Sequence, residues 1–492
     1  MLIDSMYEFV NYGLKNNLIE EIDAIYIFNK LQNLYNTNYN PHFSFLNEPQ
    51  ELDKTLNDLT FYALEKKLIK DEGCSITNFK TRLLDYLTPI PSIVQDKFFS
   101  QYKTSPIAAT NYFYDLMMKV NYVKREAIKK NIVYENDSLY GKMIITINLS
   151  KPEKDPKEIK KALTLALDSY PKCQLCYENV GYGGNKIKDA KNNLRVIPIK
   201  LNNLDYYFQY SPYGYYNEHC IVFKKEHEKM KINKETFENL FAFVDMFPHY
   251  FLGSNADLPI VGGSILSHDH YQGGNYVFPL DHAKVLKELI IDDVKVNILF
   301  WPLTCFELLS SNKDKVINLA NKIYKNWQEY NNEKINIFSS KNDVCNTVTP
   351  IARKKGNNYS LILALRNNKV STTKPYGYFH PDEKLHHIKK ENIGLIEVMG
   401  LAILPGRLKD ELDLLDKILK GTVSEEKIEL IAKHKEWYNE LKLKKNVCLK
   451  DELGKKFIQV LESTNVFKYG SLNDVIDFLN NIKWKKGKIK NE

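Results

Sequence analysis

The sequence has few cysteines and little excess of either charge. Its 492 residues contain seven cysteines, an odd and widely spaced set, which excludes a disulfide-rich secreted scaffold and fits a reducing compartment. The formal net charge of +8, from 69 basic and 61 acidic residues, is small for this length. Because nucleic-acid binders concentrate their positive charge in a patch, we expect anionic small molecules as ligands and no nucleic-acid partner.

Long hydrophobic runs and export signals are also missing. The longest apolar run, NIGLIEVMGLAILP at 392–405, is too short to span a bilayer and contains Glu397. This run predicts a buried helix that Pro405 ends. The first residues have neither the basic nor the apolar segment of a signal peptide, so a cytoplasmic protein without membrane partners is expected.

What is present is the composition of a folded protein. Hydrophobic residues make up 43% of the chain and aromatic residues 12%, which is enough for a large core. Helical spacing prevails over 1–130, two stretches that mix strand and helix patterns follow at 131–286 and 287–390, and helical spacing returns at 391–492. We expect four regions with these bounds, in an α+β fold with mostly antiparallel sheets.

Individual elements stand out within the mixed stretches. The strand candidates are short and rich in β-branched or aromatic residues, and the helix candidates have apolar residues on one side. Strands are expected at 142–150, 194–201, 206–210 and 219–227, and helices at 233–251 and 313–331.

The stretch GGSILSHDHYQGG, at 262–274, holds two histidines in a glycine-framed setting. If the stretch is extended, His268, His270 and Gln272 share one face, because side chains alternate along a strand. The two imidazoles would then lie about 6–7 Å apart, which suits two separate roles better than one shared metal ion. Packing or surface histidines without chemistry are the alternative.

A second motif is the pair Cys173 and Cys176 in KCQLCYEN. Such a C-x-x-C pair is either half of a zinc site or a redox dithiol. A redox dithiol precedes a helix, whereas turn residues follow here, so zinc is favoured. His227, at the end of a predicted strand, and His268 are the candidate third and fourth ligands of a closed structural site.

These motifs lie within blocks that resemble the type 2, bacterial, galactose-1-phosphate uridylyltransferase family of the histidine-triad superfamily. The resemblance covers most of the chain, and it is close in SPIAATNYFYDL, TINLSKPEKDPK, YPKCQLCYENVGY, FQYSPYGYYNEHCIVF, FPHYFLGSNADLPIVGGSILSHDHYQGG and HHIKKENIGLIEVMGLAILPGRLKDEL. The fold it implies has tandem histidine-triad-like antiparallel sheets with packed helices. The half at 131–286 would hold the active site, the half at 287–390 would be degenerate, and the terminal regions would be extra helical parts.

The resemblance also implies roles for single residues. Type 1 relatives carry His-Pro-His-x-Gln, which this chain matches except that Asp269 replaces the proline. By this match His270 is the nucleophile, Gln272 contacts a phosphate oxygen, and His268 is a zinc ligand together with Cys173, Cys176 and His227.

Substrate contacts follow from the same match. Asn255 and Ser264 would bind the nucleotide sugar, and Lys151 and Lys154 would neutralise phosphate, with a solvated basic loop as the alternative for the lysines. Arg195 is a further candidate for positive charge. Asp269 is expected to make a structural hydrogen bond. For His380, His386 and His387 a polar loop is expected, and the alternatives are a remnant of the degenerate half or a contact with substrate.

The implied reaction converts UDP-glucose and galactose 1-phosphate into UDP-galactose and glucose 1-phosphate through a uridylyl-histidine. Such double displacement, in galactose metabolism, predicts ping-pong kinetics. A structural zinc ion and a homodimer are expected. The alternatives are another histidine-triad nucleotidyl transferase or phosphorylase, and a non-catalytic, zinc-stabilised protein that binds nucleotide sugars.

Overall fold

The computed structural model describes residues 1–41, 51–150, 170–186, 188–263, 265–340, 342–468 and 470–482. The predicted contacts Lys151, Lys154 and Ser264 lie outside these residues. The chain divides into two compact units, of which the first comprises Met1–Arg125, Lys154–Lys200 and Asp205–Gly214, and the second comprises Glu126–Glu153, Leu201–Leu204 and Tyr215–Glu492.

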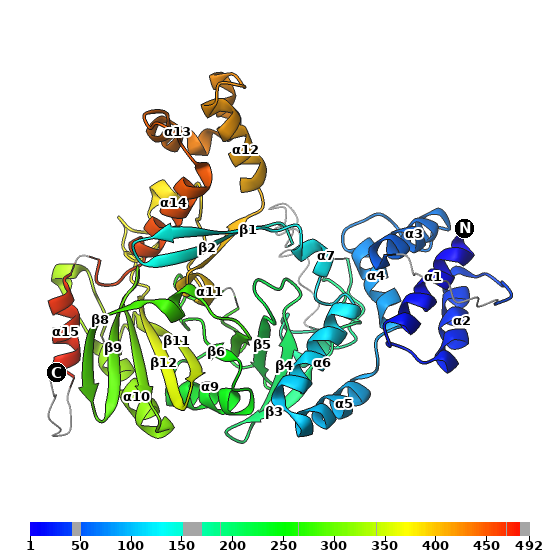
Figure 1. The fold of residues 1–492 in the computed structure, drawn as a ribbon, viewed down its shortest axis with the longest axis horizontal. Helices are drawn as coiled ribbons and strands as arrows, with labels where there is room; N and C mark the ends of the chain where they lie inside the picture. The colour runs from blue at the N-terminus through cyan, green and yellow to red at the C-terminus, as the bar shows by residue number, and fades with distance from the viewer. Residues whose placement is uncertain are drawn as a thin grey trace. The chain divides into compact units, whose positions relative to one another are not determined.

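The first unit is mainly helical, as the spacing of its apolar residues predicts. Its helices are α1 (Leu2–Lys15), α2 (Ala24–Tyr35), α3 (Leu52–Glu65), α4 (Ser75–Asp85), α5 (Pro91–Thr104) and α6 (Pro106–Lys119). Ser105 begins α6 by accepting the N–H of Ala108, and Pro106 occupies the first turn, where no N–H is needed. Helices α5 and α6 lie side by side (Figure 1). Phe98 of α5 and Phe113 of α6 are buried and pack edge to face on each other.

Within the ranges given above, the strands form two sheets, of three and ten strands. The smaller has the order β1-β2-β13, and the larger has the order β3-β4-β5-β7-β6-β11-β12-β10-β9-β8. Their bounds are β1 (Ile132–Ser138), β2 (Gly141–Asn148), β3 (Ile197–Leu201), β4 (Leu204–Tyr210), β5 (Cys220–Lys224), β6 (Phe251–Gly253), β7 (His270–Gly274), β8 (Lys284–Ile291), β9 (Val294–Phe300), β10 (Cys305–Ser310), β11 (Asn346–Lys355), β12 (Asn358–Asn367) and β13 (Leu401–Pro405). In the part of this spatial order that begins at β5 and ends at β8, each pair of neighbouring strands is antiparallel. The α+β prediction is confirmed, and the expected halves contribute strands to one sheet.

Two helices cover one face of the larger sheet. They are α9 (Lys234–Met246) and α10 (Lys313–Glu329), and both contact β11 (Figure 1). Each begins at an asparagine whose side chain accepts a backbone N–H three residues on, Asn233 from Thr236 and Asn312 from Lys315. The predicted helices at 233–251 and 313–331 are thereby confirmed within a few residues.

The predicted helix at 392–405 is wrong in its second half. A single turn, α11 (Leu395–Val398), is followed by β13, which pairs parallel with β2. Gly400 separates them with φ +92°, and a Cβ there would lie 2.8 Å from Pro279 and 2.9 Å from Trp301. A continuous apolar run signals burial without fixing its period, so helix and strand could not be distinguished from the run alone.

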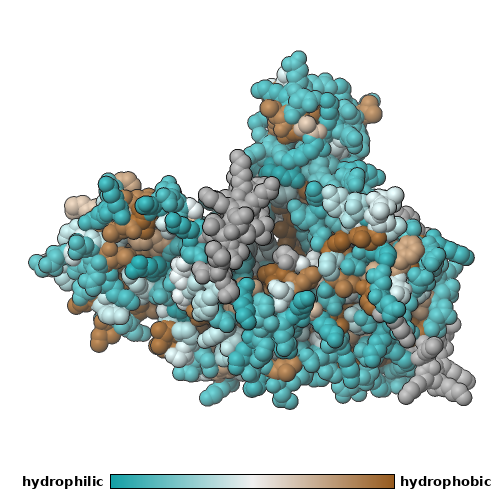
Figure 2. Space-filling model, turned by 180° about the vertical axis from the view of Figure 1, so that it is seen from behind, coloured by the Kyte–Doolittle hydropathy of each residue, from teal (hydrophilic) through white to brown (hydrophobic). Residues whose placement is uncertain are grey.

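The C-terminal region is helical after β13, as predicted. Its α-helices are α12 (Leu408–Leu419), α13 (Lys435–Lys442), α14 (Leu449–Ser463) and α15 (Leu472–Asn480). In the part of the chain described, no helix has both the length and the apolar character needed to cross a bilayer. The face of the molecule in Figure 2 is mostly hydrophilic, with hydrophobic residues in separate groups.

Candidate active site

The histidine motif forms β7 between two partner strands. His270 begins the strand and pairs with Phe223 of β5, while Gln272 lies between Ile221 of β5 and Gly253 of β6. Side chains alternate along a strand, so His270 and Gln272, two residues apart in β7, project from the same side of the sheet. The strand is shorter than 264–274, and His268 precedes it in a bend.

His270 is held by its own backbone neighbourhood. Its side chain is buried, and its Nδ1 lies 2.8 Å from the carbonyl oxygen of His268. A carbonyl oxygen only accepts, so Nδ1 carries the proton and Nε2 keeps its lone pair. Burial lowers the pKa of His270 to about 4, which leaves the ring neutral at pH 7. A neutral imidazole with a free Nε2 is a nucleophile that needs no separate base.

Gln272 is oriented by a residue that the sequence did not single out. The Nε2 of His219 lies 3.0 Å from the Oε1 of Gln272. His219 is buried two residues before Ile221, the partner of Gln272 across the ladder. The proximity of His219 to Gln272 follows from the register of β5 and β7, so it could be found only once these strands were known to pair, and not from the local sequence.

The four predicted zinc ligands come together. Cys173, Cys176, His227 and His268 each offer one ligand atom, and these atoms all lie within 4.8 Å of one another. The Nε2 of His268 donates to the carbonyl oxygen of Lys224 at 2.7 Å, so Nε2 carries the ring proton and Nδ1 keeps the lone pair that a metal ion needs. Two thiols and two imidazoles are the donor set of a closed, tetrahedral zinc site, so the residues fit that ion.

Asp269 has a structural reason to differ from the proline of type 1 sequences. Its N–H donates to the carbonyl oxygen of Glu228 at 2.7 Å, and its own carbonyl oxygen accepts the N–H of Lys224 at 3.0 Å. Proline has no N–H and would lose the first of these bonds. The carboxylate accepts the hydroxyl of Tyr271 at 3.4 Å, in line with the structural hydrogen bond expected for this residue.

Known proteins are similar to this chain along most of its length. Residues 18–229 match the N-terminal domain of galactose-1-phosphate uridyl transferase, and residues 238–439 match its C-terminal domain. The chain belongs to this family. It is 46% identical to galactose-1-phosphate uridylyltransferase of Clostridium acetobutylicum, over 96% of this chain and 97% of that protein. It is also 46% identical to the enzyme of that name from Clostridium perfringens strain 13, over 95% of each. Among solved structures, yeast Ap4A phosphorylase Apa2 matches 66% of this chain and 91% of its own, with 13% identity and a TM-score of 0.32.

Membership of the galactose-1-phosphate uridyl transferase family confirms the resemblance found in the sequence, and it directs attention to the substrate contacts. Asn255 is buried, and its Oδ1 accepts the N–H of Leu395 at 2.9 Å. A Cβ at Gly263 would lie 2.7 Å from its Nδ2, so the glycine makes room for this amide. The role of Asn255 in binding a nucleotide sugar stays a prediction.

Arg195 has a structural role in this member of the family. Its guanidinium donates to backbone carbonyl oxygens that include those of Pro89 and Thr88, and it pairs with Asp85 at 3.2 Å. Asp85 is the last residue of α4, and Thr88 and Pro89 lie in the turn after it, so the guanidinium stabilises this helix end and turn. An arginine with its donors committed in this way is not a candidate for phosphate binding.

The histidines of the second half and His434 of the C-terminal region form two groups. His380 and His386 both donate a ring N–H to the carbonyl oxygen of Pro381. His387 and His434 are joined through their Nδ1 atoms at 2.8 Å, and the Nε2 of His434 lies 3.0 Å from Glu411. In this Glu411–His434–His387 chain the two histidines are buried and Glu411 is half-buried, so packing and hydrogen bonding account for His387.

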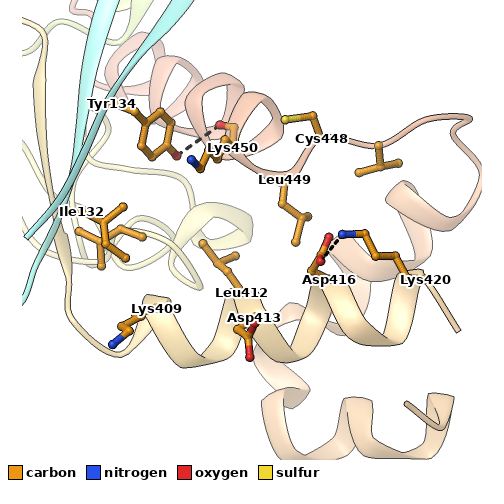
Figure 3. A pocket seen from close by; sticks show the side chains of 12 residues that line it. Ile132, Tyr134, Lys409, Leu412, Asp413, Asp416, Lys420, Cys448, Leu449 and Lys450 are labelled. Carbon is orange, nitrogen blue, oxygen red and sulfur yellow. Dashed lines mark hydrogen bonds and ion pairs between the residues drawn. The ribbon is translucent and has the colours of Figure 1, made fainter. Parts of the chain in front are cut away.

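A hollow in the C-terminal region contains none of the predicted site residues. It is lined by β1, α12 and the start of α14, with Leu412 and Leu449 among its apolar side chains (Figure 3). Lys420 pairs with Asp416 at 2.6 Å, and the hydroxyl of Tyr134 donates to the carbonyl oxygen of Lys450. Because these polar groups of the hollow bond to one another, the hollow is not a rival site, and the histidine motif remains the candidate active site.

Proposed function

We propose that this chain transfers a uridylyl group from UDP-glucose to galactose 1-phosphate, with His270 as the nucleophile. The observation that carries the proposal is the hydrogen bond from Nδ1 of His270 to the carbonyl oxygen of His268, which leaves a neutral Nε2 to react. The names of the relatives support the choice of substrates.

In the first half-reaction Nε2 of His270 attacks the α-phosphorus of UDP-glucose. The N–P bond forms as the bond from phosphorus to the bridging oxygen breaks, and that oxygen leaves with glucose 1-phosphate. The positive charge of the uridylylated ring is shared with the Nδ1–H, which keeps its bond to the His268 carbonyl oxygen. Transfer of this kind depends mainly on positioning and on donors aimed at the phosphate oxygens, and Gln272 is such a donor.

In the second half-reaction the phosphate oxygen of galactose 1-phosphate attacks the same phosphorus. The P–O bond of UDP-galactose forms, the N–P bond breaks, and Nε2 regains its lone pair. Because the two sugar phosphates use one position in turn, the kinetics are ping-pong.

Zinc held by Cys173, Cys176, His227 and His268 has a structural part in this scheme. A closed site with four protein ligands has no open position for substrate, so zinc supplies rigidity when bound. His268 then serves twice, through its ring in the metal site and through its carbonyl oxygen on His270. A homodimer and a cytoplasmic location are further parts of the proposal that rest on the family resemblance.

The rival within the superfamily is a nucleotidyl hydrolase or phosphorylase that uses the same His270. Gln272 favours transfer to a sugar phosphate, because hydrolytic relatives carry a histidine at the position that Gln272 occupies in the His-x-His-x-Gln motif. A non-catalytic nucleotide-sugar binder is the rival from another class, and it predicts that His270→Ala changes no measurable activity.

The test is to incubate the protein with UDP-glucose alone and to measure its intact mass. We expect a uridylyl adduct and release of glucose 1-phosphate in the wild type, and neither in His270→Ala. Addition of galactose 1-phosphate should then discharge the adduct as UDP-galactose. A wild-type protein without adduct, or an adduct that persists in His270→Ala, refutes the mechanism, and discharge by water alone identifies the hydrolase.

A further inference from the structure

His219 lies beside Gln272 on the face of the sheet that carries His270. Ile221 is the cross-strand partner of Gln272, and His219 is two residues before it, so all three share that face. The imidazole is 3% exposed, and its Nε2 lies 3.0 Å from Oε1 of Gln272. Gln272 itself is half-buried.

This contact decides which end of the Gln272 amide is left for a ligand. Oε1 only accepts, so Nε2 of His219 carries the proton and donates it to this bond. The amide N–H groups of Gln272 then point away from His219, and within the described ranges no protein group accepts a hydrogen bond from them. Two donors are thus presented next to His270 in the orientation that a phosphate oxygen needs.

The ring of His219 is held in place by aromatic neighbours. The ring of Tyr216 lies 4.5 Å away, and that of Tyr215 is stacked on it at 5.4 Å. The hydroxyl of Tyr216 donates to the carbonyl oxygen of Gly273 at 3.0 Å, which ties this aromatic pair to the strand of the nucleophile. A ring packed against two aromatic neighbours keeps its rotamer and thereby orients the group that it contacts.

The bond to Gln272 is also the sole hydrogen bond that the His219 ring makes with the described chain. Its Nδ1 is buried and has no partner there. Burial lowers the pKa of His219 to about 4, so the ring is neutral at pH 7 and brings no charge to the site. Burial of a ring nitrogen without a hydrogen-bond partner costs free energy. This cost is consistent with a functional role for the one bond that the ring does make.

We propose that His219 is a positioning residue, which holds the Gln272 amide so that its N–H groups face the α-phosphate of the nucleotide sugar. This inference rests on the proposed function. Without His219 the amide rotates freely, and its carbonyl oxygen meets the phosphate oxygens as often as its donors do. The loss then falls on uridylyl transfer, where charge develops, more than on the binding of galactose 1-phosphate.

A double-mutant cycle tests the coupling between the two residues. The variants are His219→Phe, which keeps a planar ring without its N–H, Gln272→Ala, and the double variant. In single-turnover reactions with UDP-glucose we expect His219→Phe to slow the release of glucose 1-phosphate roughly 10- to 100-fold. In the Gln272→Ala background the same change should slow release less than about twofold, because its target is gone.

A second readout separates positioning from a general loss of structure. With the two α-phosphorothioate diastereomers of UDP-glucose, His219→Phe and Gln272→Ala should shift the ratio of their rates in the same direction. His219→Gln, which restores an N–H donor, should recover part of the rate. His282→Phe, a change at an exposed histidine, and thermal melting of every variant are the controls.

The outcomes are distinct. Equal slowing by His219→Phe in both backgrounds, or wild-type rates in His219→Phe, overturns the positioning role while the wild type still forms its adduct. If the wild type itself forms no adduct with UDP-glucose, the proposed function fails instead.

Discussion

Nδ1 of His270 donates to the carbonyl oxygen of His268 across 2.8 Å. The backbone of a zinc-ligand candidate thereby fixes the tautomer of the proposed nucleophile. This bond predicts the position of the covalent link. The uridylyl group should be attached to Nε2, since Nδ1 has no lone pair to offer. In ¹⁵N-histidine-labelled protein, nitrogen–phosphorus coupling in NMR spectra of the adduct identifies the bonded nitrogen. Coupling at Nδ1 would show that His270 reacts from another tautomer.

Removal of the metal should affect both stability and reactivity. Cys173→Ser deletes one of four ligands, and we expect zinc content to fall from about one per chain to well below it. Uridylylation should slow as well, because the segment that presents the His268 carbonyl oxygen loses its anchor. Metal analysis and adduct formation are measured on the same samples. Cys448→Ser, at an exposed cysteine outside the cluster, should behave as the wild type, and wild-type protein without metal after gentle purification contradicts the assignment.

Gly253 occupies the position directly opposite Gln272 on β6. A Cβ there would lie 2.9 Å from Cδ1 of Leu395 and 3.0 Å from the carbonyl oxygen of Pro350. Gly253→Ala therefore has to displace Leu395 or the strand, and we expect a loss of about 1–3 kcal/mol in the free energy of unfolding, with slower uridylylation. Denaturant titration measures the first and adduct formation the second. Gly183→Ala, where a Cβ meets nothing within 4 Å, is the control, and equal losses in both variants would mean that crowding is not the cause.

Much of the site could be predicted from residue types and spacing. Cys173, Cys176, His227 and His268 were assigned by ligand chemistry, and their atoms do gather, because thiols and imidazoles at such spacing have few other uses. The single α-helices at 234–246 and 313–329 were also predicted, since their apolar faces repeat over several turns.

The rest depended on tertiary contacts that no local pattern carries. His219 acquires its role only through the pairing of β5 with β7, which brings it beside Gln272. Arg195 was one of three candidates for positive charge at the phosphate, whereas its guanidinium donates to carbonyl oxygens near α4. The run at 401–405 became a strand because β2 was available to pair with it. In each case a contact with a residue distant in the sequence determined the role of the side chain or the type of the element.

The Glu411–His434–His387 chain predicts a pH-dependent stability. Burial, and then the nearby His434, lower the pKa of His387 from 6.5 to about 3 in the folded protein. The folded state thus keeps the ring neutral at pH values where the unfolded chain is already protonated. As the pH falls below about 6.5, the unfolded state binds more protons, and stability is lost by roughly 1.4 kcal/mol per pH unit for this group until the pH nears 3.

His387→Phe should remove this contribution. The variant loses the Nδ1 bond to His434 and is expected to be less stable at pH 7, yet its free energy of unfolding should fall less steeply between about pH 6.5 and pH 5 than that of the wild type. Urea titrations at several pH values give the slope, which is independent of the constant penalty from the lost bond. His282→Phe, at an exposed position, should keep the wild-type slope. An unchanged slope in His387→Phe would show that other groups govern the acid sensitivity of the protein.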